Sequence, residues 1–73
     1  MKEIEASLKR YIDHKISCGG FLTAVLSNDL FGAVGRADYE NVQRIPEIVK
    51  YIYNHLPASS YGSAEEVKNW LNG

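Results

Sequence analysis

Cys18 and His14 are the one pair of side chains in this sequence whose types and spacing could make an activated nucleophile. They stand about one helical turn apart, so the imidazole could take the proton of the thiol if both lay on one helix. A small buried thiol beside a surface histidine explains the same spacing without any chemistry. We adopt this second interpretation and predict no catalytic residue, no enzymatic activity and no cofactor.

Side chains that could hold a metal ion are also few. Cys18 is the only cysteine, and two histidines without companion cysteines make a poor structural zinc site. The carboxylates of Asp29, Asp38 and Glu40 are better explained as a member of an ion pair, a helix cap and a solvated charge. The sequence therefore predicts no metal site.

Asp29 and Arg36 are the charges placed most unusually. In a helix over residues 20–37 they would lie two turns apart on the apolar arc that faces the core. They could form a structural ion pair there. In the alternative, the planar guanidinium of Arg36 binds a phosphate or a carboxylate near a helix end. The sequence leaves both interpretations open.

The anion-binding alternative gives neighbouring residues a role. The turn from Asp38 to Asn41 would offer backbone N–H groups to the same anion, and Tyr39 or Tyr51 would stack on a nucleotide base. Ordinary amphipathic surface is the competing explanation for the two tyrosines.

The reverse side of the 20–37 segment carries small and apolar residues where a solvated helix would carry charges. These residues are Ala24, Asn28, Phe31, Gly32 and Gly35. A helix that is apolar on both sides is usually covered on both, and a chain of 73 residues has a small core. We therefore predict self-association or a partner surface here. Because each glycine costs about 1 kcal/mol in a helix, a break near Asn28 or Gly35 is the alternative.

Hydrophobic spacing and capping signals predict one all-α domain over residues 1–73. We expect a small bundle of three main helices, over 2–17, 20–37 and about 38–56, plus a short C-terminal helix after Ser63. Asp38 and Ser63 are predicted N-caps, and Pro46 should cause a kink or a tight first turn in the third helix. Trp70 and Tyr53 should lock the last helix onto the third. The predicted apolar face of the third helix comprises Val42, Ile45, Ile48, Val49, Ile52, Tyr53 and Leu56, with Tyr51 facing outward.

Composition and charge exclude several classes of protein. A net charge of −1 gives no field that would draw the chain to nucleic acid or to acidic membranes. A helix-turn-helix reader would begin its recognition helix with Asp38-Tyr39-Glu40, which phosphate repels. The apolar run FLTAVL is too short to cross a bilayer, and MKEIEASLKR is unlike a signal peptide. An unpaired cysteine fits a reducing compartment, so we predict a cytoplasmic protein without a membrane partner.

Residues 21–30, FLTAVLSNDL, followed by Gly35-Arg36-Ala37-Asp38 and Asn41, resemble short phage and prophage proteins with an F-L-x-A-V-L-x-N-D-L…R-A-D-x-x-N pattern. The likeness continues through 51–54, Pro57, Gly62-Ser63 and Trp70. The resemblance implies a helical phage protein with no assigned activity, and so implies no catalytic residue. The chain departs from these relatives at Pro46, where they prefer a helix former.

Phage origin, which the resemblance implies, favours an accessory protein that acts by binding without turnover. Our first hypothesis is a homo-oligomeric counter-defence protein that sequesters a nucleotide signal in the host cytoplasm, with Arg36 on the phosphate. The second is a protein–protein inhibitor of a host defence factor, as anti-CRISPR proteins are, acting through Phe31. DNA binding in phage gene control is a third class. The candidate ligand- or partner-binding residues are Asn28, Asp29, Phe31, Arg36, Asp38, Tyr39, Asn41 and Tyr51.

Overall fold

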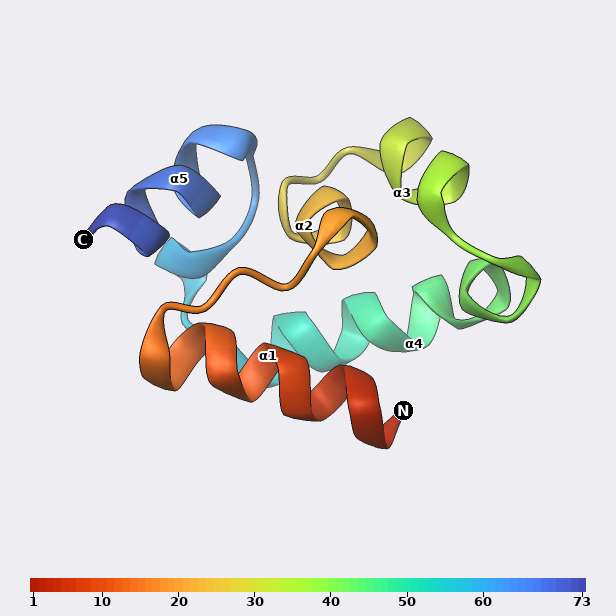
Figure 1. Cartoon of the computed structure of the whole chain (residues 1–73), viewed down its shortest axis with the longest axis horizontal. Helices are drawn as coiled ribbons and strands as arrows, with labels where there is room; N and C mark the ends of the chain where they lie inside the picture. Colours follow the sequence, from red (N-terminus) through yellow and green to blue (C-terminus); the bar gives the residue numbers. More distant parts are fainter.

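The structure, a computed structural model, describes all 73 residues and contains helices but no strand. Five α-helices follow one another along the chain: α1 (Lys2–His14), α2 (Gly20–Leu26), α3 (Leu30–Arg36), α4 (Tyr39–His55) and α5 (Ala64–Asn72). A 3₁₀ turn, η1 (Ala58–Ser60), joins α4 to α5. The predicted all-α class is confirmed, but the helices are more numerous and shorter than the predicted bundle (Figure 1).

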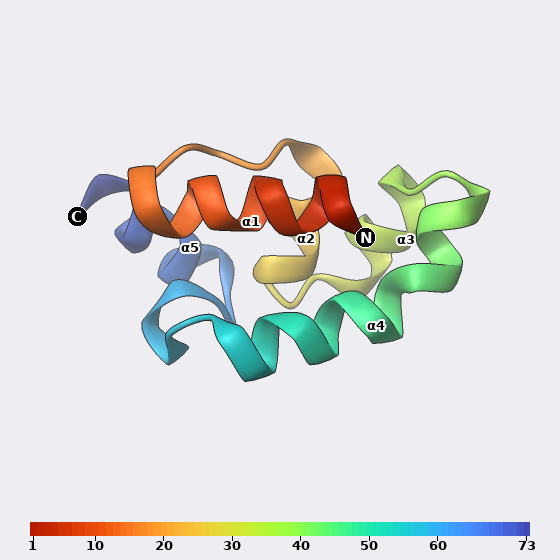
Figure 2. The ribbon, with the colours of Figure 1, turned by 90° about the horizontal axis from the view of Figure 1, so that it is seen from below.

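The two long helices, α1 and α4, both run along the lower part of the molecule in Figure 1, with α2 above them, and Figure 2 shows the two helices from below. Their inward-facing apolar side chains meet those of α2 in one small core, because each helix repeats apolar residues every three or four positions. The core consists of Leu8, Tyr11, Leu22, Leu26, Ile48, Ile52, Leu56 and Val67. None of the helices combines the length and the apolar composition that crossing a bilayer requires.

The predicted helix over 20–37 is wrong as a single element, and the break falls at one of the two alternative positions. Asn28 adopts a left-handed conformation, with φ of 60°, between α2 and α3. Asparagine tolerates this region better than most residues. Asp29 then caps α3, because its Oδ1 accepts a hydrogen bond from the Gly32 N–H at 2.9 Å. The cap gives the Gly32 N–H a hydrogen-bond acceptor, which a continuous helix would have supplied from its own backbone.

The first helix also ends earlier than predicted. α1 stops at His14, and Lys15 takes the left-handed position with φ of 56°. Gly19 precedes α2 with φ of 84°. The segment from Lys15 to Gly19 therefore runs as an extended connection along the molecule (Figure 1).

Trp70 attaches α5 to α1 and not to α4, so the prediction for Trp70 and Tyr53 is wrong. The indole Nε1–H of Trp70 donates to the carbonyl oxygen of Tyr11 at 3.0 Å. The Nζ of Lys15 lies 3.3 Å from the centre of the Trp70 ring, a cation–π contact. Tyr53, in contrast, is 75% exposed. Ser63 caps α5 as predicted, accepting from the Glu66 N–H at 3.1 Å.

α4 begins at the predicted cap and stays helical through Pro46. Its first turns are bent away from the rest of the helix, in keeping with the predicted kink (Figure 2). Asp38 Oδ1 accepts a hydrogen bond from the Asn41 N–H at 2.8 Å. The predicted apolar face of this helix is only partly correct. Ile48 and Ile52 are buried, but Val42, Val49 and Tyr53 are exposed. Tyr51, expected to face outward, is half-buried.

Candidate functional site

α3 presents its apolar side chains to solvent. Phe31 is 91% exposed and Leu30 is 62% exposed, while Val34 is 45% exposed. The one buried residue of this helix is Ala33. A surface helix normally turns its large apolar residues inward. The pattern of α3 is the reverse, which is typical of a helix that contacts another molecule.

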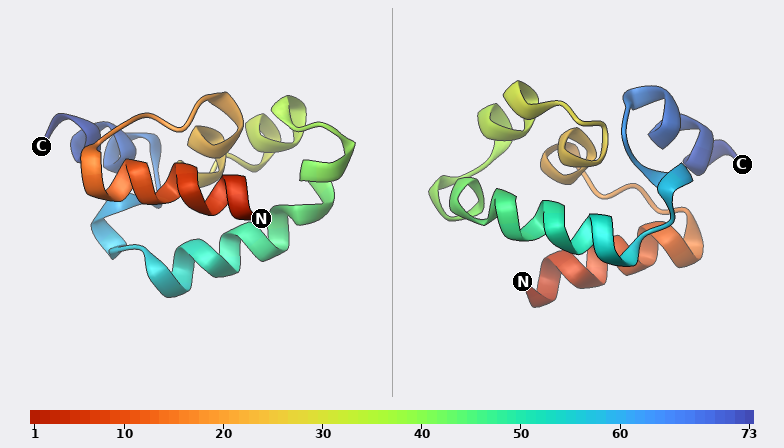
Figure 3. Two further views of the ribbon diagram at one scale, coloured as in Figure 1. Left: turned by 60° about the horizontal axis from the view of Figure 1, so that its bottom comes forward. Right: turned by 180° about the vertical axis from the view of Figure 1, so that it is seen from behind.

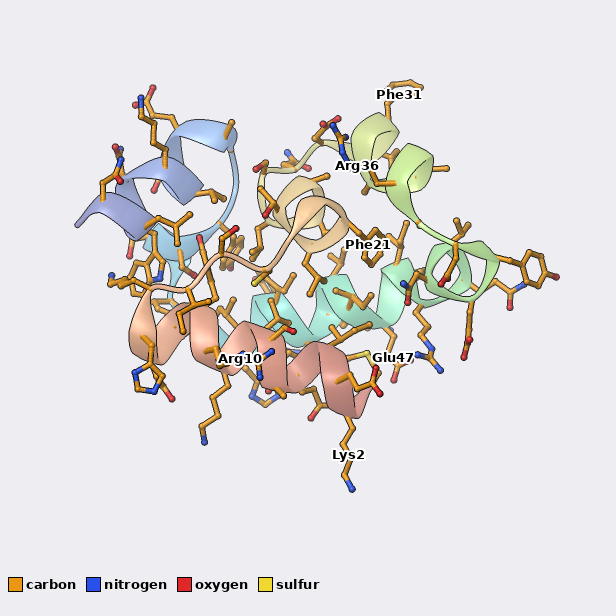
Figure 4. All side chains as sticks on the ribbon, viewed as in Figure 1. Lys2, Arg10, Phe21, Phe31, Arg36 and Glu47 are labelled. Carbon is orange, nitrogen blue, oxygen red and sulfur yellow. The ribbon has the colours of Figure 1, made fainter.

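The predicted continuous reverse face does not exist. Ala24 is buried in α2, whereas Phe31 and Gly35 are exposed on α3. The break at Asn28 rotates the two helices relative to each other, so these residues no longer share one side. Figure 4 shows Phe31 on the outer side of α3, pointing away from the body of the molecule.

Asp29 and Arg36 approach each other at Gly32 without forming an ion pair. The one ion pair of the structure joins Arg44 to Glu40, at 2.8 Å. Arg36 Nη1 donates instead to the carbonyl oxygen of Gly32, at 3.4 Å. A Cβ atom on Gly32 would lie 2.9 Å from Arg36 Nη1 and closer still to the Asp29 carboxylate. Glycine therefore leaves the room in which these two side chains lie.

The predicted ion pair is thus replaced by a cap and an exposed cation. The Asp29 carboxylate is engaged at the N-terminus of α3, and the Arg36 side chain extends across Gly20 of α2. A Cβ on Gly20 would lie 3.1 Å from Arg36 Cδ, which shows how closely the stem follows the backbone of α2. Figure 4 shows Arg36 on the side of α3 that faces α2.

Arg36 borders an open hollow of about 630 Å³ between α2, α3 and the start of α5. Three hydroxyl side chains line it, those of Ser17, Thr23 and Ser27. Hydroxyls and a guanidinium are groups that donate hydrogen bonds to phosphate or carboxylate oxygens. The hollow, which we call the Arg36 hollow, is therefore the place where the chain could hold a small anion.

The residues at the start of α4 line a different hollow. Asp38 and Asn41 border a space of about 480 Å³ together with Met1, Lys2 and Arg44. The Asn41 N–H, predicted to bind an anion, already donates to Asp38. Tyr39 is 82% exposed beside them. The structure therefore does not bring this turn into the Arg36 hollow.

Tyr51 lies apart from the other candidate residues. It is half-buried near the C-terminal end of α4, with its ring centre 4.4 Å from that of His55. The eight candidates thus divide into three groups, and only Asn28, Asp29, Phe31 and Arg36 gather around α3. A nucleotide held by Arg36 would not reach Tyr51 within one hollow, because the residues that line the Arg36 hollow do not include it.

Cys18 lies in surroundings that keep its thiol protonated. The side chain is half-buried, and its Sγ–H donates to the carbonyl oxygen of Ser7 at 3.6 Å. Burial raises the pKa of Cys18 to about 11. A reactive cysteine needs a lowered pKa. His14 is exposed, and no hydrogen bond joins it to Cys18. No group of three or more histidine, cysteine or carboxylate side chains is placed to hold a metal ion.

Sequence reasoning missed a second exposed apolar surface, on α4. Val42, Val49 and Tyr53 were assigned to the core because they follow helical spacing, as do Ile48 and Ile52. Spacing alone cannot distinguish two adjacent apolar stripes on one helix. Seven apolar positions in a helix of 17 residues match a single amphipathic face, so the sequence carried no signal that some of them would be exposed.

Comparison with known proteins gives no relative from which a role could be transferred. No protein-family model, curated protein or solved structure matches this chain.

Proposed function

We propose that this chain is a non-enzymatic binding protein that contacts a protein partner through α3, with Phe31 as the central contact. The observation that carries the proposal is the reversed pattern of α3, in which Ala33 is buried and Phe31 is 91% exposed. Exposing a large aromatic ring to water is unfavourable, and a partner pocket would remove that exposed area.

The local structure of α3 supports this role because it fixes the position of the ring. Asp29 caps the first turn, and the Arg36 side chain crosses from the last turn to α2. A helix of seven residues would be marginal by itself in water. These contacts hold it in place before a partner binds, which reduces the entropy lost on binding. If the chain is the phage accessory protein that the resemblance implies, the partner is a host defence protein.

Phe31→Glu should abolish partner capture without unfolding the chain. Tagged protein expressed in bacteria is isolated under native conditions, and co-purifying proteins are quantified by mass spectrometry. Loss of a central aromatic contact costs about 2 kcal/mol or more, so retention of a specific partner should fall on the order of 30-fold. Because Phe31 is almost fully exposed, the free energy of unfolding should change by less than about 0.5 kcal/mol.

Ala6→Glu is the matched control, because Ala6 is an exposed apolar residue on α1, away from α3. It should retain the partner as wild type does. A partner held equally by wild type, control and Phe31→Glu would show that α3 is not the binding element. Recovery of no specific partner with any of the three would contradict the proposal as a whole.

The Arg36 hollow favours a second candidate function, the capture of a small phosphate-bearing nucleotide. The exposed guanidinium and the hydroxyls of Ser17, Thr23 and Ser27 support it. The Asp29 carboxylate, which also lines the hollow, opposes an anion and favours ligands that carry an amino group beside the phosphate.

Thermal melting with a panel of cyclic dinucleotides, cyclic trinucleotides and nucleotide-ribose compounds tests this second candidate. A ligand present at 100 times its Kd should stabilise the fold by about 2.7 kcal/mol. Arg36→Ala should remove that stabilisation, whereas Arg44→Ala, which changes the exposed ion pair on α4, should retain it. A panel in which no compound raises the melting temperature would rule out nucleotide capture.

A further inference from the structure

An apolar hollow of about 250 Å³ lies between α2, α4 and the segment that follows η1. Leu26 of α2 and Ile52 of α4 form its floor, and both belong to the buried core. Tyr53 of α4 and Tyr61, after η1, border it. Seen from behind, α4 lies in front, with α2 above it and the segment from η1 to α5 beside its C-terminal end (Figure 3). We call this space the tyrosine hollow.

The walls of the tyrosine hollow are held in place by the backbone. The Gly62 N–H donates to the carbonyl oxygen of Leu26 at 2.8 Å, which ties the segment after η1 to the end of α2. Gly62 has φ of 121°, a conformation that favours glycine. Asn28, at the left-handed turn after α2, borders the same space. A ligand would therefore meet a preformed site, which reduces the entropy lost on binding.

The lining of the tyrosine hollow favours an uncharged ligand. No charged side chain borders it, whereas charged side chains border both the Arg36 hollow and the hollow at the start of α4. An ion that entered the tyrosine hollow would lose its water without gaining a partner of opposite charge, and that loss is costly.

The two tyrosines favour a flat aromatic ligand. Aromatic rings attract one another in edge-to-face and offset arrangements. Tyr53 is 75% exposed and Tyr61 is half-buried, so a ring that contacts both would remove their apolar area from water. The amide of Asn28 and the two tyrosine hydroxyls can each form a hydrogen bond with a polar atom on the edge of that ring.

The volume of the tyrosine hollow limits the size of the ligand. An apolar cavity of about 150 Å³ holds one benzene ring. Pockets for drug-sized molecules have volumes of about 300–1,000 Å³. A hollow of about 250 Å³ therefore suits one aromatic ring or two fused rings, as in indole.

From its size, its uncharged lining and its two tyrosines, we infer that the tyrosine hollow binds a small neutral aromatic compound of one ring or two fused rings. This site goes beyond the proposed function, because neither Phe31 nor Arg36 lines it. A tryptophan side chain of a protein partner would present the same ring together with its peptide groups, so the test compares the two sources.

Titration with indole, followed by NMR of the isotope-labelled protein, tests the inference. The backbone amide signals of Asn28, Val49 and Gly62 should shift to saturation, because these residues line the hollow. The signal of Phe31 should stay in place. N-acetyltryptophanamide, which carries the peptide groups of a tryptophan residue, should bind more weakly than indole.

Three ligands of nearly equal shape test the preference for a neutral compound. Benzamide is neutral, benzoate is negative and benzamidine is positive at pH 7. Benzamide should bind, and the two ions should each bind about 10-fold more weakly, because the hollow offers no opposite charge.

Val49→Trp should block the site, because its indole ring would occupy the hollow. Val49 is 48% exposed, so a larger side chain at this position leaves the core in place. The affinity for free indole should fall about 10-fold. Val42→Trp is the matched control on the same helix, at a position that does not line the hollow, and should bind indole as wild type does. Should Val49→Trp unfold, Tyr53→Ala is a second variant and should weaken binding about 3-fold or more.

An absence of saturable shifts with both indole and benzamide would overturn the inference. Equal affinity for benzamide and its two charged analogues would overturn it too, as would equal affinity of the two tryptophan variants for indole. N-acetyltryptophanamide that binds more tightly than indole would assign the hollow to a partner side chain instead. Phe31→Glu should bind indole as wild type does, so this site and the proposed function can fail separately.

Discussion

Replacing Ile48 with alanine should leave most of the chain unfolded in dilute buffer at room temperature. Ile48 is fully buried, and it lies in the core cluster with Leu8, Tyr11 and Ile52. Truncation of a buried isoleucine costs about 2–5 kcal/mol through lost transfer energy and the cavity left behind. A single core in a chain of this length supplies about 3–5 kcal/mol of net stability. The loss is therefore comparable with the whole free energy of unfolding.

Far-UV circular dichroism and urea titration measure this effect. Ile48→Val removes one methylene and should cost about 1 kcal/mol, which leaves a measurable folded state. Gln43→Ala is the control on the same helix, because Gln43 is exposed and alanine is a good helix former. Equal stability for Ile48→Ala and Gln43→Ala would show that α4 does not use Ile48 as its core contact.

Helix starts were predictable because their signals are local. Asp38 and Ser63 each accept a hydrogen bond from the backbone three residues ahead, and that geometry needs no distant partner. Asp29 has the same geometry at the start of α3. It was interpreted as a core-facing charge because the helix over 20–37 was taken as continuous. The free energy of a chain in which Asp29 caps a new helix differs by only about 1 kcal/mol from that of a chain in which Asp29 lies inside one continuous helix. Helix propensities alone do not distinguish two structures that are so close in free energy.

Contacts between distant elements were not predictable from spacing. Trp70 packs against Tyr11 of α1, with 6.2 Å between the ring centres, although sequence reasoning assigned it to the helix nearest in the chain. The extended connection after α1 allows this, because it returns the chain to α2 and leaves the end of α1 free to meet α5. Lys15 contributes by ending α1 and lying over the indole ring. No periodic pattern encodes such a contact.

The candidate site was predictable in its residues and not in its arrangement. Phe31 was recognised from its place on a face that lacked charges, and the structure confirms that it is exposed. Its supposed neighbour Ala24 is buried, because the left-handed Asn28 changes the direction of the chain between α2 and α3. One backbone angle thus decides which side chains share a surface.

Alkaline pH should unfold the chain, with Tyr11 as the main cause. Its hydroxyl is buried and donates to the carbonyl oxygen of Ser60 at 2.7 Å. Burial, with a smaller contribution from Cys18, raises the pKa of Tyr11 from 10 to about 12. The unfolded chain therefore loses this proton at lower pH than the folded chain. The contribution of Tyr11 to stability should be constant below about pH 10 and be lost as pH rises toward 12.

Cys18 acts in the same direction at lower pH. Burial raises its pKa from 9 to about 11, so the folded chain retains the thiol proton while the unfolded chain releases it. Urea midpoints measured from pH 8 to 11 should begin to fall near pH 9 in wild type. In Cys18→Ser the fall should begin about one pH unit later, because only Tyr11 then differs between the two states.

Tyr11→Phe separates the hydrogen bond from the titration. At pH 8 this variant should be less stable than wild type by about 1–3 kcal/mol, because the Ser60 carbonyl loses its buried donor. Above pH 10 its stability should decline less steeply, since phenylalanine has no proton to release. Combining Tyr11→Phe with Cys18→Ser should leave the smallest dependence on alkaline pH. A double variant as sensitive as wild type would show that exposed tyrosines and lysines, and not these two buried groups, govern alkaline unfolding.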